Sequence, residues 1–188
     1  MKIGIFGGSF DPIHCGHAMV ANYVSQLGEL DCVWLMPSPQ NPIKQTVVAD
    51  FWHRLNMCRI VASKCHAVEV SDFENKLPAP HYTYETLRAL RDSFPQDEFK
   101  LIIGSDNWES FRKWRNPDKI IDEFGLIVYM RPGFKVDGQL PENVTLINDA
   151  PTAFISSTLI RKMLNSDLNL NYLIDSDVMR YIKDNKLY

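Results

Sequence analysis

This chain of 188 residues lacks several features that would place it in a large class of proteins. Basic residues are not in excess, since 20 Lys and Arg stand against 23 Asp and Glu, for a net charge of −3. Binding along a nucleic-acid backbone requires a basic stripe, so we expect no nucleic-acid partner. The chain also has no apolar run of membrane-spanning length and no basic-then-apolar leader, so we expect a cytoplasmic protein with no membrane partner.

Cysteine is scarce as well. The four cysteines (Cys15, Cys32, Cys58 and Cys65) are too few for a disulfide framework in a chain of this length, so we expect them to be reduced. His14 and His17 could bind a metal beside Cys15, but no second Cys/His pair completes a tetrahedral zinc set. We therefore predict no metal held by protein side chains.

The most informative stretch that is present is KIGIFGGSFDPIHCGH, at residues 2–17. A short apolar run predicts a buried strand, Gly7 and Gly8 predict a tight turn, and apolar residues at helical spacing predict a helix that Gly28 closes. His14 and His17 lie just where this helix begins. The unit therefore reads as strand, glycine turn, histidine pair and helix.

The chemistry that suits this unit is phosphate binding. Gly7 and Gly8 let a ligand approach the backbone, and a helix N-terminus offers N–H groups and the positive end of its dipole. His14 and His17 share a face, and their ring N–H groups can donate to phosphate oxygens and to transition-state charge. The histidines could be ordinary turn residues, but the joint pattern favours the phosphate site.

The rest of the chain alternates between predicted strands and helices. Apolar strands are expected near residues 3–6, 32–36, 67–70, 99–103, 126–130 and 144–147. Such alternation predicts one α/β domain over residues 1–188, with a doubly wound parallel sheet. Ligands of such sheets bind at the carboxyl ends of the strands, so residues far apart in the sequence should meet at one edge.

Polar residues follow several of these strands. Asp106, after Gly104, can accept both hydroxyls of a ribose, although it could equally be a turn-forming residue. Lys44 lies in a proline-rich loop, where it either reaches a phosphate or is solvated. Arg131 follows the strand at residues 126–130. Arg54 has a weaker case, and a charge on a helix surface is the simpler interpretation.

A second helix start lies in ISSTLIR, at residues 155–161. Ser156 or Ser157 can cap the helix, and with Thr158 they can offer hydroxyls and backbone N–H groups to phosphates. Arg161 lies four residues after Ser157 and can grip a phosphate with its guanidinium. Alone, the segment would be an ordinary capped helix, but its pairing with the first motif favours a phosphate site.

These motifs together resemble a known family. GGSFDPIHCGH resembles the (T/H)xGH signature of the nucleotidylyltransferase superfamily, and ISSTLIR resembles its second signature. With YTYETL, IIGSDNW, RPG and VMRYIKDNKLY, the chain resembles the bacterial nicotinate mononucleotide adenylyltransferases nearly end to end. The resemblance implies a Rossmann-like fold, with the second motif in a helical part at residues 156–188. It also implies adenylyl transfer from ATP to nicotinate mononucleotide, with Mg²⁺ on the ATP phosphates, as a step of NAD biosynthesis.

The resemblance also implies roles for individual residues. The residues expected to carry catalysis are His14, His17 and Arg161. Those expected to bind ATP are Gly7, Gly8, Ser9, Phe10, Gly104, Asp106, Ile155, Ser156, Ser157 and Thr158. Those expected to bind the acceptor are Lys44, Thr83, Thr86, Trp114 and Arg131, with Thr83 also expected to cap a helix. The sequence departs from the family pattern at Arg115, where an aromatic residue is usual.

The tryptophans near this region divide into two kinds. Trp114 lies in the polar setting RKWRN, which favours a platform for the acceptor's pyridine ring over a core position. Trp108 is predicted to be a core residue. Two other functions stay open: transfer to another acceptor, such as phosphopantetheine or nicotinamide mononucleotide, or a non-catalytic nucleotide-binding module. YTYETL and Trp114 favour a pyridine nucleotide, and the intact motif residues favour catalysis.

Overall fold

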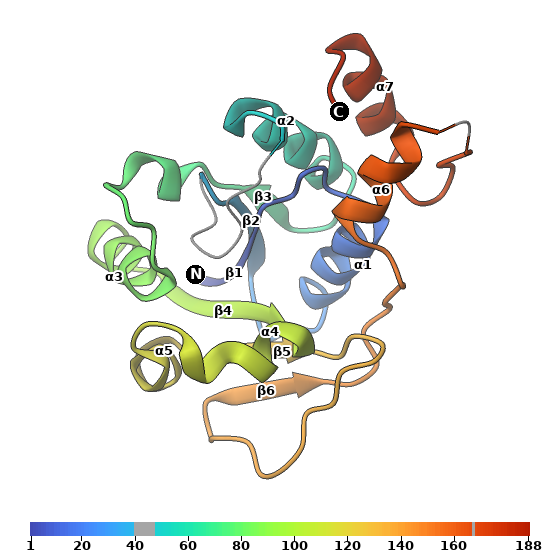
Figure 1. Ribbon diagram of the computed structural model, residues 1–188. Coiled ribbons are helices and arrows are strands. Elements are labelled where there is room, and N and C mark those ends of the chain that lie inside the picture. Colours follow the sequence, from blue (N-terminus) through green and yellow to red (C-terminus); the bar gives the residue numbers. More distant parts are fainter. Residues whose placement is uncertain (40–47, 167) are drawn as a thin grey trace.

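One parallel sheet of six strands forms the centre of the molecule (Figure 1). The computed structural model describes residues 1–39, 48–166 and 168–188. The strand order is β3-β2-β1-β4-β5-β6, and every neighbouring pair is parallel. The strands are β1 (Lys2–Gly8), β2 (Cys32–Pro37), β3 (Val68–Val70), β4 (Glu98–Gly104), β5 (Leu126–Tyr129) and β6 (Val144–Ile147). The predicted doubly wound α/β sheet is thus confirmed.

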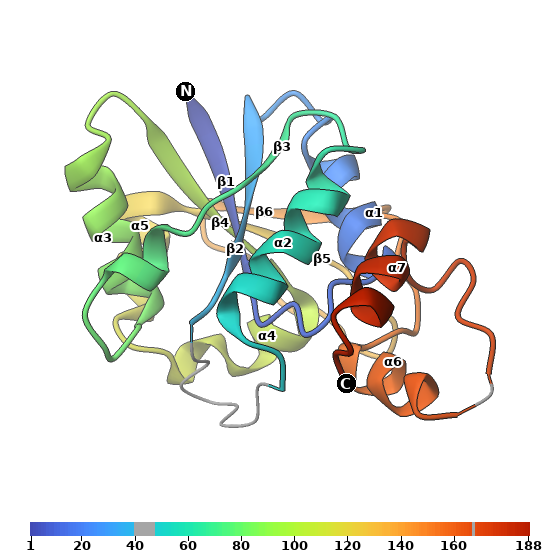
Figure 2. The ribbon, with the colours of Figure 1, turned by 90° about the horizontal axis from the view of Figure 1, so that it is seen from above.

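Helices cover both faces of the sheet (Figure 2). One face is covered by α1 (Cys15–Val24), α2 (Phe51–Ala62), α6 (Ser157–Leu164) and α7 (Ser176–Asp184). The other is covered by α3 (Thr83–Ser93) and α5 (Pro117–Phe124). Short elements complete the chain: η1 (Phe73–Lys76), α4 (Ser105–Ser110) and η2 (Phe111–Lys113). No helix in the described ranges is long and apolar enough to span a membrane.

The strands are buried on both faces because successive apolar side chains point to opposite sides of the sheet. On β1, Phe6 joins the core under α1 and α2, whereas Ile5 joins the core under α3 and α5. On β4, Ile102 and Ile103 divide in the same way. Residues of α6 and α7 belong to the first of these cores, so the C-terminal helices share the core of the sheet.

The two central strands define where a ligand can enter. The chain leaves β1 through α1 on one face and leaves β4 through α4 and α5, with α5 on the other face. Because the connections diverge there, the carboxyl ends of β1 and β4 lie at the switch point of the sheet, where such folds bind ligands. The fold therefore brings Gly8 and Gly104 to the same edge.

Two local predictions were wrong. Gly7 and Gly8 do not form the turn, because β1 runs through both of them, and the positive φ of the turn (+44°) falls on Phe10. Thr83 is the first residue of α3, and its cap is Tyr82. In the first case the strand gains ladder partners as far as Gly8, since Gly8 pairs with Pro37 on β2.

Candidate active site

The two histidines of the first motif lie against each other at the start of α1. His14 is the N-cap residue, and its ring stacks on that of His17 with 3.7 Å between the ring centres. The backbone N–H of His14 donates to Nδ1 of His17 at 3.3 Å. Because Nδ1 accepts, the proton of a neutral His17 ring lies on Nε2, so Nε2–H is a donor group of this ring.

Burial keeps His14 uncharged. Only 5% of the residue is exposed, and desolvation, helped by the positive charge of Arg131, lowers the pKa of His14 to about 4. Its Nδ1 is buried and makes no hydrogen bond within the described part of the chain. Such an unsatisfied atom is uncommon in a folded protein. An anionic ligand would both supply a partner and favour the protonated ring.

The N-terminus of α1 offers fewer free donors than the sequence predicts. The N–H of Cys15 donates to the carbonyl of Leu173, and the N–H of His17 donates to the carbonyl of His14. Anion binding at this helix start therefore depends on the imidazole rings more than on the backbone. Phe10 supports them, since its buried ring packs edge-to-face on His17 at 5.0 Å.

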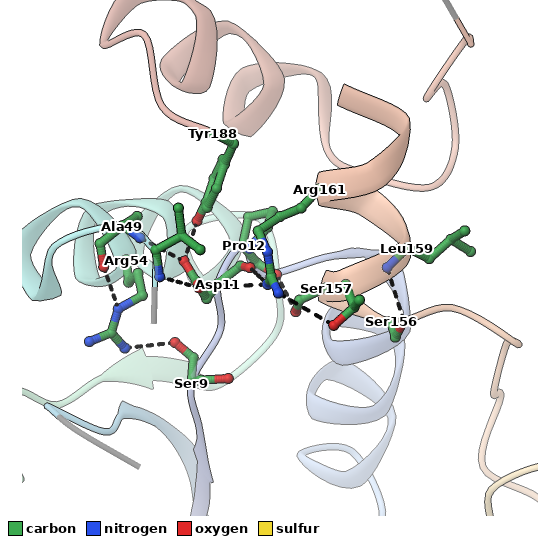
Figure 3. Close-up of polar contacts among 12 residues, drawn as sticks. Ser9, Asp11, Pro12, Ala49, Arg54, Ser156, Ser157, Leu159, Arg161 and Tyr188 are labelled. Carbon is green, nitrogen blue, oxygen red and sulfur yellow. Dashed lines mark hydrogen bonds and ion pairs between the residues drawn. The ribbon is translucent and has the colours of Figure 1, made fainter. Parts of the chain in front are cut away.

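The second motif docks directly on the first. The hydroxyl of Ser157 donates to the carbonyl of Pro12 at 2.8 Å, and Arg161 donates to the carbonyl of Asp11 (Figure 3). A Cβ on Gly16 would lie 2.8 Å from Ile155, so only glycine fits where the segments meet. The predicted meeting of the two motifs is therefore present.

The helix start of the second motif keeps free backbone donors. Ser156 caps α6, because its hydroxyl accepts from the N–H of Leu159. The N–H groups of Ser157 and Thr158 make no hydrogen bond among the described residues. Unpaired N–H groups at the start of a helix are the usual donors to phosphate. Arg161 also donates to the Thr158 hydroxyl, at 3.4 Å.

Arg54 is not a surface charge, as the sequence analysis expected, but one of the most buried side chains in the protein. It is 1% exposed and donates to the carbonyls of four residues: Ser9, Ser38, Pro39 and Ala49. It thereby ties the loop after β1 to the loop after β2. A signal was available, because Arg54 shares a helix face with the buried residues Cys58 and Val61, at i+4 and i+7.

Asp11 is a second residue that the sequence analysis missed, although it lies inside the first motif. Its carboxylate, 2% exposed, accepts from the N–H groups of Val48 and Ala49 and from the hydroxyl of Tyr188. It also lies 3.6 Å from the guanidinium of Arg161. Figure 3 shows Asp11 between Tyr188, Arg161 and the start of α2, so one carboxylate joins three distant parts of the chain.

At the other side of the switch point, Asp106 pairs with Arg131. One carboxylate oxygen accepts from the Arg131 guanidinium at 2.6 Å, while the other is buried without a hydrogen-bond partner in the described ranges. The backbone N–H of Arg131 donates to the Ser105 hydroxyl, which fixes β5 to the start of α4. Arg131 also lines a small pocket together with His14 and His17. Arg131 therefore lies near the two histidines of the first motif.

The residues expected at the acceptor have mixed surroundings. The hydroxyl of Thr86 is buried and donates to Glu74 at 2.8 Å, and burial raises the pKa of the Glu74 carboxyl. This hydroxyl is therefore already engaged by the protein. Thr83 lies at the start of α3, where the first N–H groups of a helix have no intrahelical partner. Lys44 lies outside the described residues.

The aromatic residues after β4 form a short stack. Trp108 lies nearly parallel to Phe111, with 5.6 Å between ring centres, and Trp114 lies tilted against Phe111 at 5.4 Å. Both tryptophans are half-buried against the core under α3 and α5, so Trp108 is less buried than a core residue. The guanidinium of Arg115 lies 4.8 Å from the ring centre of Tyr82, beside the start of α3.

The described residues contain no group of three His, Cys, Asp or Glu side chains placed to hold a metal ion. His14 and His17 are the residues of the pocket most able to bind a metal, but imidazole suits transition metals and not Mg²⁺, which prefers oxygen ligands. The donors that meet here, two imidazoles, two arginines and a helix N-terminus, match an anion with several oxygens.

Comparison with known proteins agrees with this arrangement. A cytidylyltransferase-like family profile matches residues 5–163. A protein of Bacteroides thetaiotaomicron named probable nicotinate-nucleotide adenylyltransferase is 42% identical over 98% of this chain and 92% of its own length. The protein of the same name from Bacteroides fragilis is 44% identical over 96% and 90%.

Solved structures agree as well. The nicotinic acid mononucleotide adenylyltransferase of Plasmodium falciparum, solved with NaAD, superposes with a TM-score of 0.85. It is 28% identical, over 98% of this chain and 96% of its own. Since family profile, full-length relatives and fold all coincide, the chain belongs to the cytidylyltransferase-like family and, within it, to the nicotinate-nucleotide adenylyltransferases.

Proposed function

We propose that this protein transfers the adenylyl group of ATP to nicotinate mononucleotide, giving nicotinate adenine dinucleotide and pyrophosphate in the synthesis of NAD. The observation that carries the proposal is the stacked pair of His14 and His17 beside the free N–H groups of α6. Relatives at 42% and 44% identity carry the name of this activity, and a structural neighbour was solved with the dinucleotide product.

The reaction needs charge stabilisation more than a base. The phosphate of the mononucleotide is already a nucleophile at neutral pH, and it attacks the α-phosphorus of ATP in line. The bond from that phosphorus to the oxygen of the β-phosphate breaks, and pyrophosphate leaves with the electron pair. Nε2–H of His17 would donate to phosphate oxygens as charge develops, which is the pattern of positioning and electrostatic catalysis.

The other residues would hold the leaving group and the nucleoside. The N–H groups of Ser157 and Thr158 would donate to the β- and γ-phosphates, with Arg161 adding charge. His14 would gain a partner for its buried Nδ1. The unpartnered oxygen of Asp106 would accept from the ribose. The N–H groups, the His14 nitrogen and the Asp106 oxygen are atoms that have no hydrogen-bond partner in the described part of the chain.

Magnesium fits this site as part of the ATP complex. Mg²⁺ is often held by substrate phosphates and water with few protein ligands, so we expect it to enter the site with ATP. When bound, it neutralises phosphate charge and supports departure of pyrophosphate.

The surroundings of α3 favour the acid acceptor over the amide. Thr83 begins the helix, whose positive dipole end favours an anion, and the Arg115 guanidinium lies on the adjacent Tyr82 ring. Charge-assisted hydrogen bonds are about twice as strong as neutral ones. We expect kcat/KM for nicotinate mononucleotide to exceed that for nicotinamide mononucleotide by at least about tenfold, which corresponds to about 1.4 kcal/mol.

The experiment measures pyrophosphate release from ATP and Mg²⁺ with each acceptor offered singly. The proposal expects release with nicotinate mononucleotide, less with the amide and none with phosphopantetheine. Equal or greater kcat/KM with the amide would change the acceptor assignment and leave adenylyl transfer standing. Release only with phosphopantetheine would favour another member of the superfamily. ATP binding without release for any acceptor would favour a binding module.

A further inference from the structure

Tyr129 is the last residue of β5 and stands at the switch point of the sheet. It pairs in register with Gly104 on β4, so the two residues face the same side. The residue is 7% exposed, and its ring packs edge-to-face on Phe6 at 5.9 Å. A Cβ added to Gly104 would lie 3.1 Å from Cζ of Tyr129, so this glycine makes room for the phenol.

The phenol hydroxyl is unpartnered although the ring is buried. The Tyr129 hydroxyl makes no hydrogen bond within the part of the chain that the structure describes. A buried tyrosine usually finds a hydrogen-bond partner for its hydroxyl. Tyr129 instead lines the small pocket that His14, His17 and Arg131 also line. A buried side chain that lines this pocket and has an unpartnered hydroxyl is suited to bind a ligand.

The groups around Gly104 indicate which chemical class of ligand can bind here. The added Cβ would also lie 2.4 Å from Oδ1 of Asp106, the buried oxygen without a partner. Asp106 and Arg131 both act on Tyr129, but burial dominates and raises the pKa of Tyr129 to about 12. The phenol therefore stays protonated and can donate, while the carboxylate can only accept.

An acceptor and a donor that both lie close to one glycine match two neighbouring hydroxyls. One hydroxyl of a ligand can donate to Asp106, and the oxygen of the other can accept from the phenol. Ribose offers such a pair at its 2′ and 3′ positions, whereas a phosphate oxygen would be repelled by the Asp106 carboxylate. We propose that the Tyr129 hydroxyl is a further ATP-binding group, which donates to a ribose hydroxyl of the nucleotide. This inference rests on the proposed function, in which the site takes ATP.

The test compares wild type with Tyr129→Phe, which removes the hydroxyl and retains the ring on Phe6. We expect the Kd of a non-hydrolysable ATP analogue, measured by calorimetry without acceptor, to rise about five- to tenfold, the usual range for one hydrogen bond. KM for ATP should rise alike, with kcat and the acceptor KM within about twofold of wild type. Wild type should bind ATP more tightly than 2′-deoxy-ATP and 3′-deoxy-ATP. In Tyr129→Phe the ratio of Kd values should be smaller for one of the two deoxy-nucleotides, because the variant has already lost the hydrogen bond to that ribose hydroxyl.

Tyr84→Phe is the matched control. Tyr84 is 5% exposed, and its hydroxyl donates to Glu123 on the α3 and α5 side of the sheet. This variant should keep the wild-type Kd for the analogue, which separates a ligand contact from a general effect of removing a buried hydroxyl. Thermal unfolding of both variants checks that the fold persists.

Three results would overturn the inference: an unchanged Kd and unchanged deoxy-nucleotide penalties in Tyr129→Phe, a loss confined to kcat, or a rise confined to the acceptor KM. A wild-type protein that binds the analogue but forms no dinucleotide would contradict the proposed function and leave this contact standing. A wild-type protein that does not bind the analogue would contradict both.

Discussion

Two carboxylate–arginine pairs lie at the carboxyl edge of the sheet, and they differ in how completely the protein satisfies them. Asp11 beside Arg161 is 2% exposed, and it accepts from two backbone N–H groups and the Tyr188 hydroxyl. Asp106 beside Arg131 is less enclosed, with 24% of its side chain exposed, and one of its oxygens has no partner among the described residues.

The difference distinguishes a carboxylate that holds loops together from a carboxylate that keeps an oxygen for a ligand. Buried polar groups are nearly always hydrogen-bonded, so a saturated group such as Asp11 has no capacity left for a substrate and serves to hold loops together. Among the described residues, polar atoms without a hydrogen-bond partner include one oxygen of Asp106, Nδ1 of His14 and the Tyr129 hydroxyl. His14 and Tyr129 line one pocket, and Tyr129 and Asp106 both lie close to Gly104. An unsatisfied polar atom costs stability, which a ligand that pairs with it restores on binding.

The largest effect is expected at Arg54, which, like Asp11, is buried and holds loops together through its hydrogen bonds. Arg54→Met would leave four carbonyl groups without their donor, and losing one partner of a buried charged network typically costs about 3–5 kcal/mol. Urea unfolding should show a loss of this size. Arg59→Met, at an exposed arginine of the same helix, should change stability by less than about 0.5 kcal/mol. Equal effects of the two substitutions would refute a scaffold role for Arg54.

His14 belongs to the groups that keep an atom without a partner among the described residues. Its burial should make the free energy of unfolding depend on pH. Its pKa of about 4 in the folded protein lies below the usual 6.5, so the unfolded chain binds a proton first as the pH falls. The contribution of the neutral ring is complete above pH 6.5 and is lost between pH 6.5 and 4. By pH 4.5 the loss should reach about 2–3 kcal/mol.

Urea unfolding of wild type and His14→Gln over this pH range measures the effect. The variant should lose less stability than wild type as the pH falls, because glutamine does not titrate. His66→Gln, at an exposed histidine, serves as the control because it leaves His14 in place. If wild type and His14→Gln lost stability in parallel, His14 would not be buried as a neutral ring.

The smallest effect of the three is expected from a substitution of Asp106. Asp106→Ala should raise KM for ATP by about tenfold and leave kcat near wild type, because a ribose contact is made equally in the ground state and the transition state. The variant should cost little stability, since the ion pair with Arg131 is partly exposed. Steady-state kinetics with ATP varied would show an unchanged KM if Asp106 only shapes the turn.

Local patterns in the sequence determined the architecture of this protein. Short apolar runs located the six strands of the sheet, because such runs need only their own side chains to predict a buried strand. Of the two serines predicted to cap α6, Ser156 is the one that does so. Alternation of strands and helices then implied a parallel sheet whose motifs meet at one edge, which the structure confirms.

What only the tertiary structure decided is which polar groups the protein uses up and which it leaves free. The partners of Arg54 and Asp11 lie in other loops and at Tyr188, 177 residues from Asp11. The hydroxyl of Thr86 is taken by Glu74, while that of Tyr129 remains open. No local pattern carries this information, because hydrogen-bond saturation depends on atoms that long-range packing brings within about 3 Å.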